Sequence, residues 1–187
     1  MIETKRLILR PWQDSDAPAL FKYASDKEVG IPAGWPPHTS VENSLEIIHT
    51  VFASPEVYAV VLKSTGEPIG SCGIVFPDNH NGNEINSREG EIGYWIGKPF
   101  WGQGLIPEAV KALLGRGFNV LGMTTIWCSY YDGNDKSRRV TEKCGFRPHH
   151  TNQDIISPLG DKLTEHYCVM TADYYRALHR TDAVDTK

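Results

Sequence analysis

The residues best suited to chemistry lie between residues 89 and 146. Within that stretch, Trp101–Leu105 reads WGQGL and falls between an expected strand and an expected helix. Such a turn presents consecutive backbone N–H groups to an anion, and the helix dipole adds attraction. A pyrophosphate would fit there. The same glycine spacing recurs at Gly115 and Gly117, so the spacing alone is not diagnostic, and glycines that only form a tight turn are the alternative.

Three small polar residues, Asn134, Ser137 and Thr141, form a second candidate group. They stand at positions i, i+3 and i+7 and therefore share one face of an expected helix near its N-terminus. Their amide and hydroxyl groups could hydrogen-bond a ligand. The plainer alternative is that Asn134 only caps the helix and Ser137 is solvated.

A third candidate is the carboxylate of Glu91, a few residues before the glycine turn. Alternation along a strand places Glu91 on one face with Glu89, Gly93 and Trp95. A carboxylate there could act as a general base. Most exposed glutamates do no chemistry, so a solvated acid near a strand end is the alternative.

Several familiar sites are absent from the sequence. It contains neither GxxxxGK[ST] nor a full GxGxxG with an acidic residue about 20 positions later, which disfavours a nucleotide hydrolase or a dehydrogenase. HExxH is also absent, and His149 and His150 are expected on opposite faces of a strand, so no metal site is predicted. The widely spaced cysteines are predicted to be buried, reduced thiols: Cys72, Cys128, Cys144 and Cys168.

The composition indicates a folded protein with no nucleic-acid partner. Hydrophobic residues make up 40% and charged residues 22% of the 187, as in an ordinary globular domain. A net charge of −4 and a pI near 6.0 give no indication of the basic surface that binding nucleic-acid phosphates requires. No segment approaches about 18 uncharged apolar residues, and the opening MIETKRLILRPW is unlike a signal peptide. We therefore expect a cytoplasmic protein without a membrane partner.

Hydrophobic periodicity predicts an α/β fold. Strands are expected at residues 4–10, 57–62, 69–75, 90–97, 124–129 and 162–170, and from residue 146, the last two pairing as a long hairpin. Helices are expected after caps at residues 14–16, from about residue 39, from Pro107, at residues 135–144 and near the C-terminus. Residues 30–38 read as a turn and 77–88 as a surface loop. One domain is expected over residues 1–178, followed by a flexible tail, 179–187.

Two ordered motifs carry a resemblance to a known family. EIGYWIGKPFWGQGLIPEA, followed about 30 residues later by NDKSRRVTEKCGF, resembles the GNAT superfamily of N-acetyltransferases, and most of all its RimJ/RimL-like branch. The opening ETKRLILRPWQDSDAPALF is similar to that branch too, so only residues 30–50 and the tail match loosely. The resemblance implies a mixed, mostly antiparallel twisted sheet of about seven strands with four or five helices. A splayed strand pair would form the acetyl-CoA cleft.

The resemblance also implies roles for individual residues. Strand residues would pair with the pantetheine amides, the glycine turn would cradle the pyrophosphate, and the facing helix would supply further contacts. The residues expected to bind acetyl-CoA are Trp95, Ile96, Gly97, Trp101, Gly102, Gln103, Gly104, Leu105, Asn134 and Ser137. Glu91 stands where several members have a general base.

This chain departs from the family pattern at two positions. Pro99 replaces the usual Gln or Arg before the glycine turn, which should spare phosphate contacts made by backbone N–H groups. Thr141 replaces a tyrosine that in many members protonates the departing thiolate. Ser137 is the expected substitute, and its hydroxyl could hydrogen-bond the developing thiolate, with water as another proton source.

The expected function is acetyl-CoA-dependent acetyl transfer to a primary amine in a ternary complex, with Glu91 and Ser137 as catalytic residues. The acceptor would be a protein N-terminal α-amine or a small-molecule amine, selected by loops at residues 30–38, 77–88 and 152–162. Trp35, Asp78 and Glu84 are candidates to line the acceptor site. The alternatives are a non-catalytic acyl-CoA-binding regulatory module and an unrelated phosphate-binding α/β protein. Both a monomer and a homodimer paired through the C-terminal hairpin are compatible with the sequence.

Overall fold

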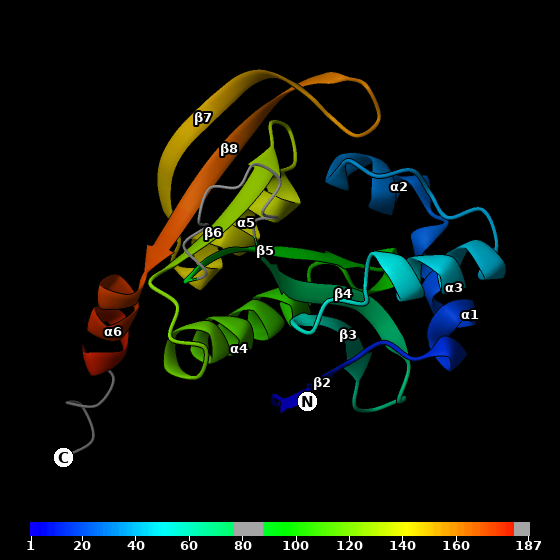
Figure 1. Ribbon diagram of the computed structural model, residues 1–187, viewed down its shortest axis with the longest axis horizontal. Coiled ribbons are helices and arrows are strands. Elements are labelled where there is room, and N and C mark those ends of the chain that lie inside the picture. Colours follow the sequence, from blue (N-terminus) through cyan, green and yellow to red (C-terminus); the bar gives the residue numbers. More distant parts are fainter. Residues whose placement is uncertain (77–87, 182–187) are drawn as a thin grey trace.

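A computed structural model describes residues 1–76 and 88–181, and one eight-stranded sheet forms its centre (Figure 1). The strands are β1 (Ile2–Glu3), β2 (Leu7–Arg10), β3 (Val57–Leu62), β4 (Pro68–Val75), β5 (Glu89–Ile96), β6 (Thr125–Tyr131), β7 (Arg147–Ile156) and β8 (Lys162–Thr171). Their order is β1-β2-β3-β4-β5-β6-β8-β7, and all neighbours are antiparallel except β5 and β6. The mixed, mostly antiparallel sheet is confirmed, with one strand more than expected.

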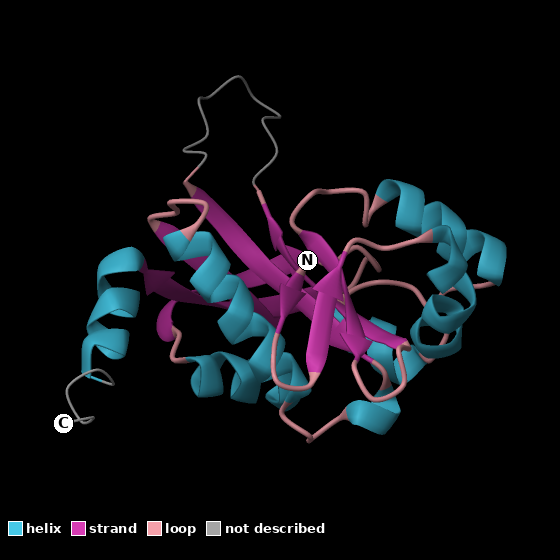
Figure 2. Cartoon of the chain, turned by 90° about the horizontal axis from the view of Figure 1, so that it is seen from below, coloured by secondary structure: helices cyan, strands magenta, loops and turns pink. Residues whose placement is uncertain are grey.

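Helices cover both faces of the sheet (Figure 2). They are α1 (Ala17–Ala24), α2 (Lys27–Gly30), α3 (Val41–Thr50), α4 (Leu105–Asn119), α5 (Asp135–Cys144) and α6 (Ala172–Thr181), with short 3-10 helices η1 (Asp14–Asp16), η2 (Ile31–Ala33) and η3 (Lys98–Phe100). The larger core lies under α4, whose buried Leu113, Leu114 and Phe118 pack with strand residues such as Ile74 and Ile126. A second core joins α1 and α3 to the other face through Leu20 and Ile48. The buried positions of α4 recur at helical spacing, which explains why this segment is helical.

The parallel pair β5 and β6 depends on α4. Antiparallel neighbours can be joined by a tight turn, whereas parallel neighbours need a crossover, and α4 is that crossover. The helix begins at Leu105, two residues before the expected start at Pro107. It begins there because Gly104 takes the left-handed conformation, with φ +71°, and redirects the chain.

The first expected strand is divided in two. Residues 4–10 were predicted as one strand, but β1 ends at Glu3 and β2 starts at Leu7. The Glu108 carboxylate of α4 accepts hydrogen bonds from the Thr4 hydroxyl at 2.6 Å and from the Arg6 backbone N–H at 2.7 Å. The Arg6 guanidinium donates a further bond, Nε to Oε2, at 2.7 Å. A tertiary contact about a hundred residues away thus replaces strand pairing.

Residues 30–38 are more ordered than a turn. The prediction was wrong for residues 30–33, which end α2 and form η2. Asp26 caps α2 by accepting from the Glu28 N–H, and Pro32 suits the start of the 3-10 turn. The chain then reverses at Gly34, with φ +82°.

The C-terminal hairpin of β7 and β8 is confirmed; it forms one end of the sheet and curves away from β1–β5 (Figure 1). The acceptor loop expected at residues 152–162 is wrong in part, because β7 continues to Ile156. His149 and His150 were expected on opposite strand faces, but a bulge between Pro148 and His150 brings their Nδ1 atoms within 2.8 Å. All four cysteines are free and buried, as predicted. The terminal helix α6 extends through Thr181.

Candidate active site

Strands β5 and β6 separate along their length. They pair only at Glu89 with Thr125, Gly90 with Ile126 and Glu91 with Trp127. Beyond these three pairs β5 continues to Ile96 and β6 to Tyr131 without pairing to one another. A gap therefore opens in the middle of the sheet, and α4 and α5 begin beside it.

Backbone hydrogen-bonding groups from both strands point into this gap. The Gly97 N–H, just after β5, donates to the Ile69 carbonyl of β4 at 2.8 Å. In an antiparallel pair every second residue turns its backbone groups toward the partner strand, so Trp95 also faces β4. The backbone groups of Tyr94 and Ile96 consequently face the gap. On the other side of the gap, the Asp132 N–H donates to the Thr164 carbonyl of β8. Ser129 lies an odd number of residues from Asp132, so its backbone groups point the opposite way, toward β5. Two strand edges thus face one another, and an extended chain bearing amides could pair with them.

This alternation distinguishes among the residues expected to contact pantetheine. The Ile96 N–H points toward the gap, whereas the Trp95 and Gly97 N–H groups point toward β4. The Ile96 carbonyl accepts the indole N–H of Trp101 at 2.9 Å, which fixes the ring beside the glycine turn. Of Trp95, Ile96 and Gly97, which were expected to bind acetyl-CoA, only Ile96 therefore has an N–H placed to reach a ligand in the gap.

The glycine turn is open where a ligand would approach. Gly102 and Gly104 both have positive φ, +75° and +71°. No heavy atom lies within 4 Å of a Cβ built on Gly102, and a Cβ on Gly104 would meet only the Arg6 guanidinium at 3.8 Å. Gln103 is held by its side-chain bond to the Pro99 carbonyl, and its own carbonyl accepts from Arg6. The first N–H groups of α4, which have no partner within the helix, therefore stand beside an open turn at the positive end of the helix dipole.

The N-terminus of α5 lies close to this turn. Asn134 caps α5 by accepting the Ser137 N–H at 3.1 Å, as expected, and Gly145 ends the helix with φ +82°. The Asn134 side-chain amide also donates to the Pro32 carbonyl at 2.9 Å. The Lys136 ammonium lies 3.7 Å from the centre of the Trp101 ring. Sequence reasoning missed Lys136, which adds positive charge beside the glycine turn.

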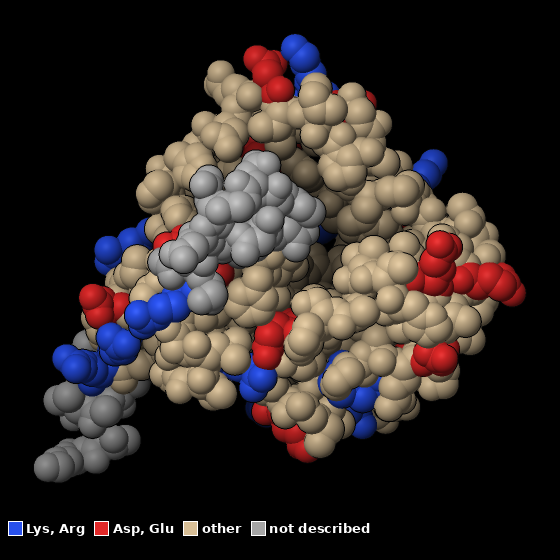
Figure 3. Space-filling view, viewed as in Figure 1, with Lys and Arg blue, Asp and Glu red and all other residues tan. Residues whose placement is uncertain are grey.

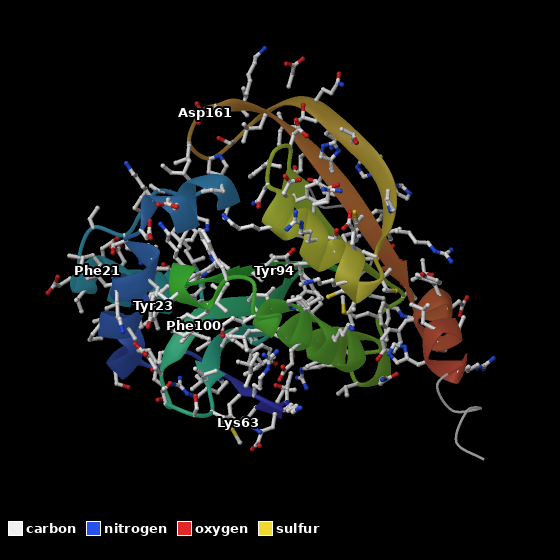
Figure 4. All side chains as sticks on the ribbon, turned by 180° about the vertical axis from the view of Figure 1, so that it is seen from behind. Phe21, Tyr23, Lys63, Tyr94, Phe100 and Asp161 are labelled. Carbon is white, nitrogen blue, oxygen red and sulfur yellow. The ribbon has the colours of Figure 1, made fainter. Side chains whose placement is uncertain are left out.

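Ser137 and Thr141 have different surroundings despite their shared helix face. The Ser137 hydroxyl is 2.8 Å from the phenol oxygen of Tyr94, a residue that sequence reasoning did not select (Figure 4). Thr141 is 2% exposed and donates its hydroxyl to the Arg138 carbonyl at 2.7 Å. Ser137 therefore remains a candidate for chemistry, whereas Thr141 belongs to the core.

Glu91 lies at the last residue pair before the strands separate, on the opposite face from Tyr94. Its Oε1 accepts the Ser129 hydroxyl at 2.6 Å. Burial raises the pKa of Glu91 above its ordinary value, the bond from Ser129 opposes this, and the charge of Glu165 raises the pKa further. Such a carboxyl takes up a proton more readily than a solvated one, as a general base requires.

The same face carries further groups that the sequence did not reveal. Tyr167 of β8 donates its hydroxyl to Glu165 at 2.8 Å and stacks on the His150 ring at a centroid distance of 4.7 Å. A pocket of about 280 Å³ lies beside Glu91. It is lined by Val75, Phe76, Glu89, Gly90, Glu91, Trp127, His150 and Tyr167. Strand register alone could have placed Tyr167 opposite Ser129, but the hairpin register was not readable from the sequence.

The segment after α2 closes over the other end of this face. Trp35 packs edge-on against Trp95 with ring centroids 5.8 Å apart. Gly34 lies so close to Tyr131 that a Cβ there would come within 2.8 Å of the ring. The space-filling view is hollowed between this region and the β7–β8 hairpin (Figure 3). The other acceptor-site candidates, Asp78 and Glu84, lie outside the described residues.

Within residues 1–76 and 88–181, no group of three or more His, Cys, Asp or Glu side chains could hold a metal ion. Nor does any helix there have the length and apolar character needed to cross a membrane.

Comparisons with known proteins agree with this geometry. Residues 6–147 match the family described as "Acetyltransferase (GNAT) domain". The Uncharacterized N-acetyltransferase p20 of Bacillus licheniformis is 31% identical over 149 residues, which is 77% of this chain and 80% of that protein. A GNAT acetyltransferase structure from Bacillus anthracis superposes with a TM-score of 0.79 at 22% identity, covering 92% of this chain and 98% of its own. The ribosomal-protein-S5-alanine acetyltransferase of Vibrio fischeri has the same fold, with a TM-score of 0.69 at 19% identity and coverage of 91% and 96%. The match to the family over most of the chain, together with the sheet that divides between β5 and β6, shows that this protein belongs to the GNAT acetyltransferase family.

Proposed function

We propose that this acetyltransferase moves the acetyl group of acetyl-CoA onto a primary amine by direct transfer in a ternary complex. The observation that carries the proposal is the half-buried Glu91 carboxyl at the point where β5 and β6 separate. It lies on the face with the pocket and the aromatic residues, opposite the face on which α4 and α5 begin. The acetyl donor and the amine would therefore meet from the two sides of one gap.

Acetyl-CoA would bind with its pantetheine between the separated strand edges. Its pyrophosphate would take the N–H groups of Gly102 to Leu105, with Lys136 nearby as a counter-charge. The backbone groups of Tyr94 and Ile96 would pair with the pantetheine amides and polarise the thioester carbonyl. The asparagine cap at Asn134 keeps the first turn of α5 beside the gap.

The reaction itself needs one base and one hydrogen-bond donor. Glu91 accepts the proton of the acceptor ammonium through water, and the free amine attacks the thioester carbon. A C–N bond forms, the C–S bond breaks, and the sulfur leaves as a thiolate that accepts a hydrogen bond from the Ser137 hydroxyl. The second proton that the nitrogen loses on becoming an amide passes through water to this thiolate, which gives the neutral CoA thiol. No covalent enzyme intermediate is required.

The charges around the acceptor face favour a cationic amine. The carboxylates of Glu89 and Glu91 on β5 and of Glu165 on β8 lie on the same face of the sheet. The tryptophan and tyrosine rings that lie between them, on β6 and β8, suit a cation with an apolar body. A protein N-terminus and a small amine both have this chemistry. The Vibrio fischeri neighbour is named for a ribosomal protein, which makes a protein N-terminus the first acceptor to test.

Calorimetry with acetyl-CoA tests the cofactor site. The wild-type protein is expected to bind, and Gly104→Glu is expected to lose binding, because it places a carboxylate at the phosphate turn. Gly66→Glu is the matched control, since Gly66 has the same φ of +71° in the β3–β4 turn and open space around it. It should carry the same backbone strain and bind acetyl-CoA normally. Absence of wild-type binding would overturn the proposal.

Turnover separates an enzyme from a regulatory module that only binds acyl-CoA. Release of the CoA thiol can be followed with a thiol reagent on N-terminal peptides and small amines. All four protein thiols are buried, so the protein should contribute little background. Binding of acetyl-CoA without turnover on any primary amine would favour the non-catalytic module.

A further inference from the structure

The Tyr94 phenol is a half-buried polar group for which the proposed transfer has no role. It projects from β5 toward the first turn of α5, near the centre of the molecule (Figure 4). Its oxygen is 2.8 Å from the Ser137 hydroxyl and 3.3 Å from the Ser137 carbonyl. The contact joins β5 to the first turn of α5, and the Tyr94 backbone lies beyond the last residue pair of β5 with β6.

We infer that Tyr94 is a positioning residue for acetyl transfer, donating its phenol proton to Ser137 Oγ so that the Ser137 O–H is directed at the departing sulfur of CoA. The inference rests on the proposed function. It also accounts for the departure at Thr141, where other members of the family have a tyrosine on the helix. Here a strand residue, Tyr94, supplies the phenol, and the phenol would act on the sulfur through the Ser137 hydroxyl instead of directly.

The direction of the hydrogen bonds follows from the groups on either side. The Cys128 thiol lies 3.9 Å from the Tyr94 oxygen and is placed to donate to it. Burial raises the pKa of both Cys128 and Tyr94, so both keep their protons. Either oxygen could donate in the 2.8 Å contact, and the Tyr94 hydroxyl also lies 3.3 Å from the Ser137 carbonyl as a second acceptor. Because a phenol is the more acidic hydroxyl and the Ser137 hydroxyl is the nearer acceptor, we assign the Tyr94 proton to Ser137 Oγ. The Ser137 N–H is occupied by the Asn134 cap, which leaves the Ser137 O–H as the donor available to a ligand in the gap.

The chemical consequence is a donor that is already oriented when charge develops. As the C–S bond breaks, negative charge collects on sulfur, and a fixed O–H stabilises it without reorganisation. A serine without the tyrosine could rotate its proton toward other acceptors, such as the carbonyls of its own helix. Tyr94 therefore acts on the rate, and not on the affinity for acetyl-CoA.

Steady-state kinetics test whether Tyr94 acts through Ser137. The variants to compare with the wild type are Tyr94→Phe, Ser137→Ala and the double variant. Tyr94→Phe should lower kcat about tenfold with the KM for acetyl-CoA unchanged, and Ser137→Ala should lower kcat at least as much. Because the two hydroxyls act as one unit, the double variant should be no slower than Ser137→Ala alone. Tyr130→Phe is the matched control, since that phenol on β6 lies against the His166 ring and should leave kcat unaltered. Losses that multiply in the double variant, or a Tyr94→Phe variant as fast as the wild type, would overturn the inference.

A binding measurement gives a readout that needs no acceptor. CoA carries a thiol that ionises near the ordinary cysteine pKa of about 8.5, whereas desulfo-CoA has none. Between pH 7 and 9.5 the wild type should gain affinity for CoA over desulfo-CoA by about tenfold, since a hydrogen bond to a charged group contributes about 1.5–3 kcal/mol. Tyr94→Phe and Ser137→Ala should both lose most of that gain. An equal gain in wild type and Tyr94→Phe would contradict the role of Tyr94 even where the wild-type enzyme is active. Failure of the wild type to turn over any amine would instead remove the proposed function.

Discussion

Replacing Glu91 by glutamine should slow acetyl transfer and stabilise the fold at the same time. Glutamine keeps an oxygen that can accept the 2.6 Å bond from Ser129 but cannot accept a proton. General bases typically contribute a factor of about 10² to 10⁴, and a base that acts through water belongs near the lower end. A loss of about 100-fold in kcat raises the barrier by about 2.7 kcal/mol, since each tenfold costs about 1.36 kcal/mol. The KM for acetyl-CoA should change little, because Glu91 lies on the acceptor side of β5.

The pH dependence should separate the two effects of Glu91. Its pKa is raised in the folded protein, so on raising the pH the unfolded chain loses this proton first. Stability is therefore greatest below the unfolded pKa and falls as the pH rises through the folded pKa, by about 1.4 kcal/mol for each unit between the two values. Glu91→Gln lacks this loss and should melt higher than wild type at neutral pH, with little difference in acid. Its residual rate should climb with pH as the acceptor amine loses its own proton.

Glu89→Gln is the control for this experiment. Glu89 lies two residues earlier on the same strand face, accepts the Trp127 indole N–H at 3.1 Å, and lies further from the gap. Because Glu89 contributes only charge to the acceptor face, its substitution should raise the KM for a cationic acceptor and leave kcat within a few-fold of wild type. The reasoning is refuted if Glu91→Gln keeps the wild-type kcat and pH profile, or if Glu89→Gln loses as much activity as Glu91→Gln.

Three further substitutions, one of them with a matched control, test the fold. Arg116→Met should lower the free energy of unfolding by about 2 kcal/mol at pH 7, because Arg116 makes two 2.6 Å bonds to Glu56, which is 7% exposed. Arg116 holds the pKa of Glu56 below its ordinary value, so the deficit in urea denaturation should shrink as the pH falls and the carboxyl protonates. Gly97→Ala should cost about 1–3 kcal/mol, because its Cβ would come within 2.6 Å of the Tyr23 ring, whereas Gly93→Ala meets nothing within 4 Å and should melt near wild type. Thr141→Tyr introduces the family residue at a position that is only 2% exposed. The variant should melt at a lower temperature by differential scanning calorimetry and should not have a higher kcat than wild type. A faster or more stable variant would contradict the burial of this position.

Local signals in the sequence predicted most of the fold. The helix Asp135–Cys144 matches its prediction at both ends, because an asparagine cap and a left-handed glycine mark those ends chemically. Alternation and flanking turn residues gave Val57–Leu62 equally well. The predictions were wrong where contacts between residues far apart in the sequence determine the local structure. Glu108 divides the first strand, and the bulge at Pro148 turns two histidines to one side.

The candidate site could be predicted only in part, for a related reason. Glu91 and the glycine turn were found because strand alternation and motif order carry them. Tyr94 was missed because it lies on the other strand face, and its partner Ser137 is 43 residues away. Glu165 and Tyr167 were missed because their positions depend on the register of β8 against β6. Spacing within one element is readable from a sequence, whereas pairing between elements is not.

The short contact between β5 and β6 also bears on how the chain folds. Strands β1 to β5 pair in chain order, and β6 to β8 form a second group of antiparallel neighbours. Each group closes through connections that are mostly shorter than the α4 crossover, and three residue pairs join the groups within the sheet. Because loop-closure entropy delays distant pairings, we expect the two groups to assemble first and this junction to form late. Acetyl-CoA, bound across the junction, would then mainly retard unfolding, and the cell's supply of cofactor would set the lifetime of the native protein.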